Sequence, residues 1–70
     1  MDNISKFTKA VSILRENTEM IFYGEVETEE DFNNVQWVTG TDDTGTAITT
    51  TTNPHSELTW TKVKAEMDKL

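Results

Sequence analysis

A chain of 70 residues without a single cysteine has to fold around one small apolar core. Neither a disulfide nor a cysteine-based zinc site can reinforce that core. A chain of this length buries only about 60% of the surface that its unfolded form exposes, so its stability is modest. We therefore expect one domain over residues 1–70, supported by tight packing or by self-association into a homo-oligomer.

Both ends of the chain have the apolar spacing of an amphipathic helix. The stripe of the first helix, within residues 4–16, comprises Ile4, Phe7, Ala10 or Val11, and Leu14. The stripe of the last helix comprises Trp60, Val63, Met67 and Leu70. Asp2 or Asn3 is suited to cap the first helix, and Thr59 the last. Leu58 precedes that second cap, where it can pack against Val63 as a hydrophobic staple.

The middle of the chain is rich in β-branched and aromatic residues, which favour strands. Residues 19–26 predict a first strand, with Gly24 marking a bulge. Its alternation places Met20, Phe22 and Val26 on one face and Ile21, Tyr23 and Glu25 on the other. Residues 35–39 and 46–52 predict a hairpin around the turn-forming segment 40–45, ended by Asn53-Pro54.

The element order defines the fold class. Residues 27–32 predict a loop or a single helical turn, in which Thr28 and Asp31 form a capping box. The chain as a whole then predicts an α+β fold of order α-β-β-β-α. The N- and C-terminal helices cover the apolar face of a three-stranded antiparallel sheet. We expect Trp37 and Trp60 in the core, because large aromatic groups supply most of what a small chain can bury.

Charge is distributed unevenly along the chain. The six Lys and Arg residues all lie within residues 1–15 and 59–70, whereas residues 16–58 contain ten carboxylates and no Lys or Arg. A net charge of −7 repels nucleic acid phosphates and anionic lipid surfaces, so we expect binding to neither. Such a field favours a basic protein partner, although acids also simply keep small domains in solution.

No catalytic, cofactor or metal site is predicted. The only histidine, His55, lies in an expected loop, and there is no cysteine nucleophile. The segment Asp42-Asp43-Thr44-Gly45 lacks the alternating ligand spacing and the distal glutamate of a calcium loop. The three glycines form no phosphate-binding motif. We therefore expect a protein that is not an enzyme.

The longest apolar run, residues 20–23, is far shorter than a membrane span. The first nine residues, MDNISKFTK, lack the basic start and long apolar stretch of a signal peptide. We therefore expect a cytoplasmic protein that contacts no membrane.

Three segments together resemble a known group of proteins. They are ISKFTKAVSILR at residues 4–15, NNVQW at 33–37 and LTWTKVKAEMDKL at 58–70. In this order they are similar to small uncharacterised accessory proteins of tailed bacteriophages. These pair an N-terminal helix and a tryptophan-bearing strand with a C-terminal helix ending in an Ala-Glu pattern. Residues 39–52 are longer than is usual in that family. The resemblance implies a setting in the cytoplasm of an infected host, or association with the virion.

Our leading hypothesis is a phage-encoded, non-enzymatic protein-binding or assembly accessory module. The candidate interaction residues are Tyr23, Glu27, Glu29, Glu30, Asp31, Asp42, Asp43, Thr50 and Thr52. The threonine strand to which the last two belong offers an edge for strand addition. The alternative hypothesis is an acidic decoy that occupies a basic surface of a host nucleic-acid-binding protein.

Overall fold

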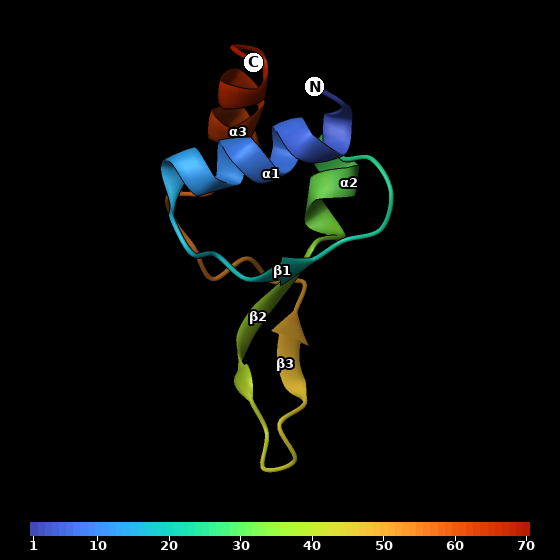
Figure 1. Cartoon of the computed structure of the whole chain (residues 1–70), viewed down its shortest axis with the longest axis vertical. Coiled ribbons are helices and arrows are strands. Elements are labelled where there is room, and N and C mark those ends of the chain that lie inside the picture. Colours follow the sequence, from blue (N-terminus) through green and yellow to red (C-terminus); the bar gives the residue numbers. More distant parts are fainter.

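Three helices and one three-stranded antiparallel sheet account for the regular structure of the chain in a computed structural model that describes all of residues 1–70 (Figure 1). The sheet order is β1-β2-β3, so the predicted α+β fold is confirmed. The elements are α1 (Asn3–Leu14), β1 (Met20–Ile21), α2 (Glu29–Asn33), β2 (Gln36–Thr41), β3 (Ala47–Thr50) and α3 (Trp60–Met67).

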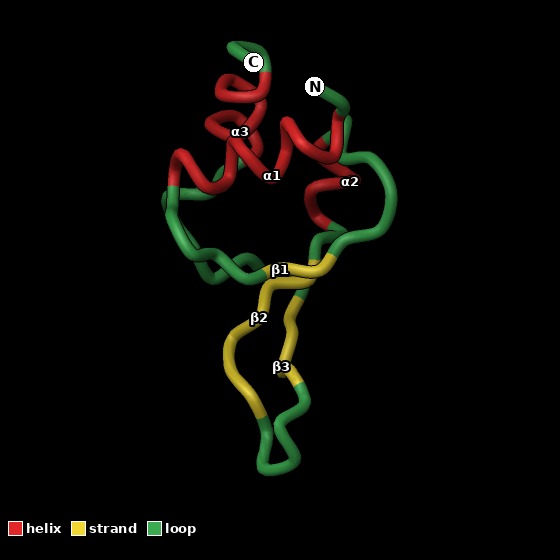
Figure 2. Tube along the Cα trace, viewed as in Figure 1, coloured by secondary structure: helices red, strands yellow, loops and turns green.

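The molecule is elongated, with extents of 40 × 21 × 20 Å. The helices and β1 gather at one end, and the hairpin of β2 and β3 projects from the other (Figure 2). Only the base of the hairpin reaches the core: Trp37 is buried, whereas residues 39–48 are all exposed. The expected cover of the sheet by the terminal helices is therefore confined to β1 and the start of β2.

The first helix begins directly after its predicted N-cap residue, Asp2. The Asp2 carboxylate accepts a hydrogen bond from the Ser5 amide at 2.8 Å, which satisfies one of the free N–H groups of the first turn. Phe7, Ala10 and Val11 are buried on the inner face. Ile4 differs from the prediction, because it is 45% exposed at the outer edge of the stripe.

The last helix is capped by Thr59, whose side chain accepts from the Lys62 amide. Val63 and Met67 are buried and Trp60 packs partly buried against the core. Leu70 differs from the prediction, since it lies beyond the end of the helix and is 39% exposed. Leu58, directly before the cap, is fully buried, as a staple residue should be.

The middle of the sequence contains a helix rather than a loop. The predicted capping box is present: the Thr28 side chain accepts from the Asp31 amide, and the Asp31 carboxylate accepts from the Thr28 amide. Three acidic residues in the first turn also suit the positive end of this helix. The resulting helix α2 is only five residues long, yet it places Phe32 in the core.

The first strand is shorter than predicted. Pairing with β2 covers only Met20 and Ile21, and the chain then turns at Gly24, which has a positive φ of 75° and forms no bulge. Beyond the turn, Asn3 takes the place of a neighbouring strand. Its side-chain amide donates to the Val26 carbonyl at 3.0 Å and its side-chain oxygen accepts from the Val26 amide at 2.7 Å. Val26 is thereby held in the core while its backbone groups stay paired.

Phe32 lies at the centre of the core. Its ring stands 6.3 Å from Phe7, 5.8 Å from Trp37 and 5.7 Å from Trp60, measured between centroids. It thus connects α1, β2 and α3 through one side chain. Edge-on aromatic pairs contribute beyond the area that they bury.

We expect Phe32→Ala to lower the free energy of unfolding by about 3–5 kcal/mol, because it leaves a cavity in the only core. That loss is a large part of the total stability of so short a chain. Urea denaturation followed by tryptophan fluorescence measures it. The control is Tyr23→Ala at a side chain that is 85% exposed, which should cost less than about 0.5 kcal/mol. Equal losses in the two variants would contradict the central role of Phe32.

We expect Asn3→Ala to lower the free energy of unfolding by about 1–3 kcal/mol, because the amide and carbonyl of Val26 lose their partners together. The matched control is Asn33→Ala, which removes an exposed amide side chain at the end of α2 and should change stability little. The same denaturation experiment compares the two. A neutral Asn3→Ala would show that the Val26 segment is held by its apolar contacts alone.

Candidate functional site

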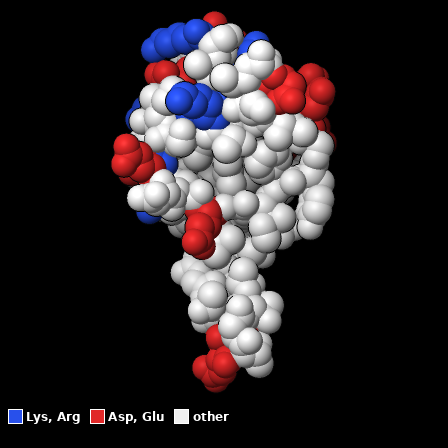
Figure 3. All heavy atoms as spheres, in the orientation of Figure 1, with Lys and Arg blue, Asp and Glu red and all other residues white.

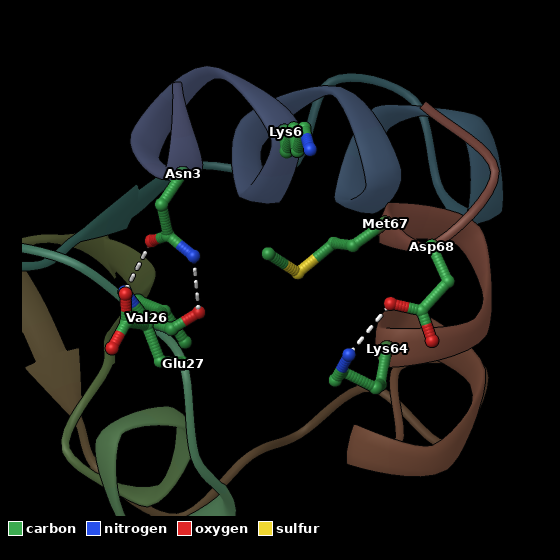
Figure 4. Close-up of a pocket in the computed structure, with 7 residues that line it drawn as sticks. All are labelled: Asn3, Lys6, Val26, Glu27, Lys64, Met67 and Asp68. Atoms are coloured by element: carbon green, nitrogen blue, oxygen red, sulfur yellow. Dashed lines mark hydrogen bonds and ion pairs between the residues drawn. The ribbon is translucent and has the colours of Figure 1, made fainter. Parts of the chain in front are cut away.

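Four hollows lie in the surface of the molecule. One of about 280 Å³ lies between α1 and α3 (Figure 4) and is lined by Asn3, Lys6, Val26, Glu27, Lys64, Met67 and Asp68. Its Asn3 amide is occupied by Val26, and its Lys64 ammonium lies 2.6 Å from the Asp68 carboxylate. No buried side-chain nitrogen or oxygen in the molecule lacks a hydrogen-bond partner. Lys6 forms no ion pair, so its ammonium is a free charge at this hollow.

His55 is half-buried at the edge of the core. Its ring stands edge-on to Trp37, with centroids 5.7 Å apart, and its backbone amide donates to the Asn53 side chain. Burial, and next the positive charge of Arg15, lower the pKa of His55 below its ordinary value. The imidazole is therefore neutral at pH 7, and its ring packs as an aromatic group.

The predicted acidic candidates divide between two places. Glu27, Glu29, Glu30 and Asp31 stand at the start of α2, whereas Asp42 and Asp43 stand at the tip of the hairpin, at the opposite end of the molecule (Figures 1 and 3). No three or more His, Cys, Asp or Glu side chains are grouped so that they could hold a metal ion. The predicted acidic candidates thus form two separate surfaces.

At the start of α2 the carboxylates crowd one another. The Asp31 carboxylate accepts from the Glu27 amide at 3.1 Å and the Thr28 amide at 3.2 Å, and the first of these bonds is the main cause that lowers the pKa of Asp31. The neighbouring Glu25 raises the pKa of Glu27, through a hydrogen bond between the two carboxyl groups and through charge repulsion. Asp31 therefore has a structural role, while the glutamates give this surface its negative field.

The tip of the hairpin is organised by Asp42. Its carboxylate accepts from the Thr44 hydroxyl at 2.6 Å, the Thr44 amide at 2.9 Å and the Thr46 amide at 3.0 Å. Gly45 follows with a positive φ of 85°, which a residue with a side chain rarely adopts. These hydrogen bonds, that of the Thr44 hydroxyl first, lower the pKa of Asp42. Asp42 thus shapes the turn, and Asp43 beside it is exposed.

Of the two edge strands of the sheet, β1 is only two residues long, and β3 is the longer one. Thr46 and Ile48 direct their carbonyls towards β2, where they accept from the Asp42 amide and the Thr39 hydroxyl. Because alternate residues of an antiparallel strand point their backbone groups in opposite directions, Ala47 and Thr49 direct theirs away from the sheet. Ile48, between them, is 48% exposed. The accessible edge therefore consists of residues 47–49.

The two threonines predicted to contact a partner lie outside this stretch. Thr50 is half-buried opposite Trp37 at the base of the hairpin, and its hydroxyl accepts from the Thr52 amide. The sequence reasoning missed Ile48. Its signal was present, since Ile48 is the one large aliphatic residue in the predicted strand 46–52.

Tyr23 is 85% exposed on the outer side of the chain after β1, as the alternation predicted. Met20 and Phe22, on the other face, pack against the core. The ring of Tyr23 borders a hollow of about 150 Å³ that also includes Glu25 and Asp31. Tyr23 therefore adjoins the acidic surface of α2 rather than the hairpin.

None of the three helices has the length and apolar character needed to cross a membrane. Comparison of the chain with protein-family models, with curated proteins and with solved structures gives no match.

The pKa of Asp42 should rise towards its ordinary value in Thr44→Val, because the substitution removes the hydroxyl that donates to the carboxylate. A lowered pKa means that the ionised carboxylate stabilises the turn. That contribution is complete above the unfolded-state pKa and is lost as the pH falls through the lowered one. Carboxyl NMR titration of wild type, Thr44→Val and the control Thr41→Val measures the shift. The same midpoint in all three proteins would contradict this account of the turn.

Proposed function

We propose that the chain is a non-enzymatic protein-binding module, and that the projecting part of its hairpin, residues 39–48, together with Thr49, is its docking element. We call these residues the hairpin arm. The observation that carries the proposal is the free edge of β3 on an arm that stands clear of the core.

The arm costs stability without burying anything in return. Each ordered residue loses about 1–2 kcal/mol of backbone conformational entropy, and the ten residues of 39–48 are all exposed. A chain with so small a core gains nothing from such an extension on its own. Docking of a partner strand on β3 would add main-chain hydrogen bonds and cover Ile48, which accounts for the arm as an interaction element.

The non-enzymatic part of the proposal rests on the dispersal of the reactive groups. The candidate carboxylates occupy two distant surfaces, Asp31 and Asp42 are engaged in caps and turns, and His55 is packed against Trp37. General acid–base catalysis needs such groups to face one cleft. The resemblance to accessory proteins of tailed bacteriophages supports an assembly role in the host cytoplasm or on the virion, with a protein partner and no nucleic acid.

One observation favours the decoy as a second candidate. The crowding of Glu25, Glu27 and the first turn of α2 produces a dense negative surface that a basic protein groove could bind. Such binding would depend on exposed charges and would weaken steeply with salt. Binding through the hairpin arm depends on backbone hydrogen bonds and Ile48, and it would persist in high salt.

We expect Ile48→Lys to abolish capture of protein partners from bacterial lysate, because a charged lysine on an edge strand opposes pairing with another strand. The matched control is Ile13→Lys, the same substitution on α1 at a residue with nearly the same exposure, 49% against 48%. Immobilised wild type and Ile13→Lys should retain the same bands at 0.5 M salt, and Ile48→Lys should lose them. Bands that disappear with salt but survive Ile48→Lys would favour the decoy instead.

A further inference from the structure

We infer that a second copy of this chain pairs with the β3 edge, antiparallel, about a two-fold axis at Ile48. The inference rests on the proposed use of the hairpin arm and adds a second copy of the chain as one partner of that edge. It combines three features of residues 44–56: the direction of their backbone groups, the absence of charge, and the position of Ile48.

The backbone groups fit this arrangement. Ala47 and Thr49 point their amides and carbonyls outward, because those of Thr46 and Ile48 are directed to β2. With the axis at Ile48, Ala47 of one copy lies opposite Thr49 of the other, and the reverse pair forms by symmetry. Each pair exchanges two hydrogen bonds, all from residues within the bounds of β3. An axis at Thr49 would instead require Thr51, which lies beyond the strand.

The charge distribution makes this edge the place where two copies repel each other least. Each chain carries a net charge of −7, so two copies repel over most of their surfaces. Residues 44–56 contain no Asp, Glu, Lys or Arg, and they are the longest such stretch of the chain. Natural sheet edges are usually guarded by lysine, proline or an inward charge, and β3 contains none of these.

The symmetry also keeps the acidic tips apart. Asp42 and Asp43 stand six and five residues before the axis, so antiparallel pairing directs the two tips in opposite directions. Each tip approaches the segment around Asn53 of the other copy, whose nearest carboxylate, Glu57, is four residues further on and is paired with Arg15. Pairing of one edge with the same edge uses both, so the assembly closes at two copies.

Ile48 supplies the apolar contact. On the outer edge it forms the non-hydrogen-bonded pair with its own copy, in which Cα atoms approach to about 4.5 Å. The contact is small compared with the roughly 1,200 Å² of a stable interface. We therefore expect a weak dimer, with a dissociation constant on the order of 0.1 mM.

Disulfide trapping of Ile48→Cys tests the arrangement, since the natural chain has no other cysteine. A Cα separation near 4.5 Å lies within the range that a disulfide can bridge. In a glutathione redox buffer, Ile48→Cys should form at least about ten times more covalent dimer than Ile13→Cys, whose position is equally exposed. Equal yields would overturn the inference, and a higher yield for Thr49→Cys would overturn the register.

Sedimentation equilibrium and amide NMR of the unmodified chain provide a second test that no substitution can compromise. Raising the concentration to about 1 mM should shift the amide signals of Ala47 and Thr49 and leave that of Ile13 in place. A chain that stays monomeric throughout would overturn self-pairing. The proposed function would still stand if lysate partners were captured by wild type and lost in Ile48→Lys. If the chain dimerises but wild type and Ile48→Lys capture the same lysate proteins, the proposed function alone is overturned.

Discussion

The fold depends on the contacts of one ring. Phe32 stands against Phe7, Trp37 and Trp60, and so joins two helices and the central strand that share no covalent constraint. In a chain without disulfides, stability has to come from such a shared contact, because a core of ten buried residues cannot be divided into independent parts. The five-residue helix α2 is too short to be stable alone. Its capping box and the burial of Phe32 stabilise each other.

The sequence predicted what local chemistry determines. The caps at Asp2, Thr28 and Thr59 are confirmed, because a side-chain oxygen beside free amides acts within three residues. The hairpin and the inward position of Trp37 are confirmed as well, since alternation fixes them within one strand. The α+β class followed from the order of these elements.

What the sequence could not predict depends on contacts between distant residues. Asp2 or Asn3 was predicted to cap the first helix. Asp2 does so, whereas Asn3 binds Val26, 23 residues away. How much of the sheet the helices cover depends on which residues of their apolar stripes are buried in the folded chain. Ile4 and Leu70 are not among them. For the candidate site, the acidic residues were identified but not their separation, and Ile48 became visible only once β3 was placed at the edge.

The small number of apolar residues explains why one end of the molecule has a buried core and the other does not. Apolar surface is sufficient to bury the helical end, and every large fully buried side chain lies there or at the base of the hairpin. The arm has only its ladder of hydrogen bonds and the turn around Asp42 to hold it. Local opening should therefore begin at the arm, at a free energy well below that of global unfolding. An uncharged edge that deforms easily can adjust its backbone to pair with an incoming strand. The aromatic cluster around Phe32 keeps the helical end folded during that adjustment.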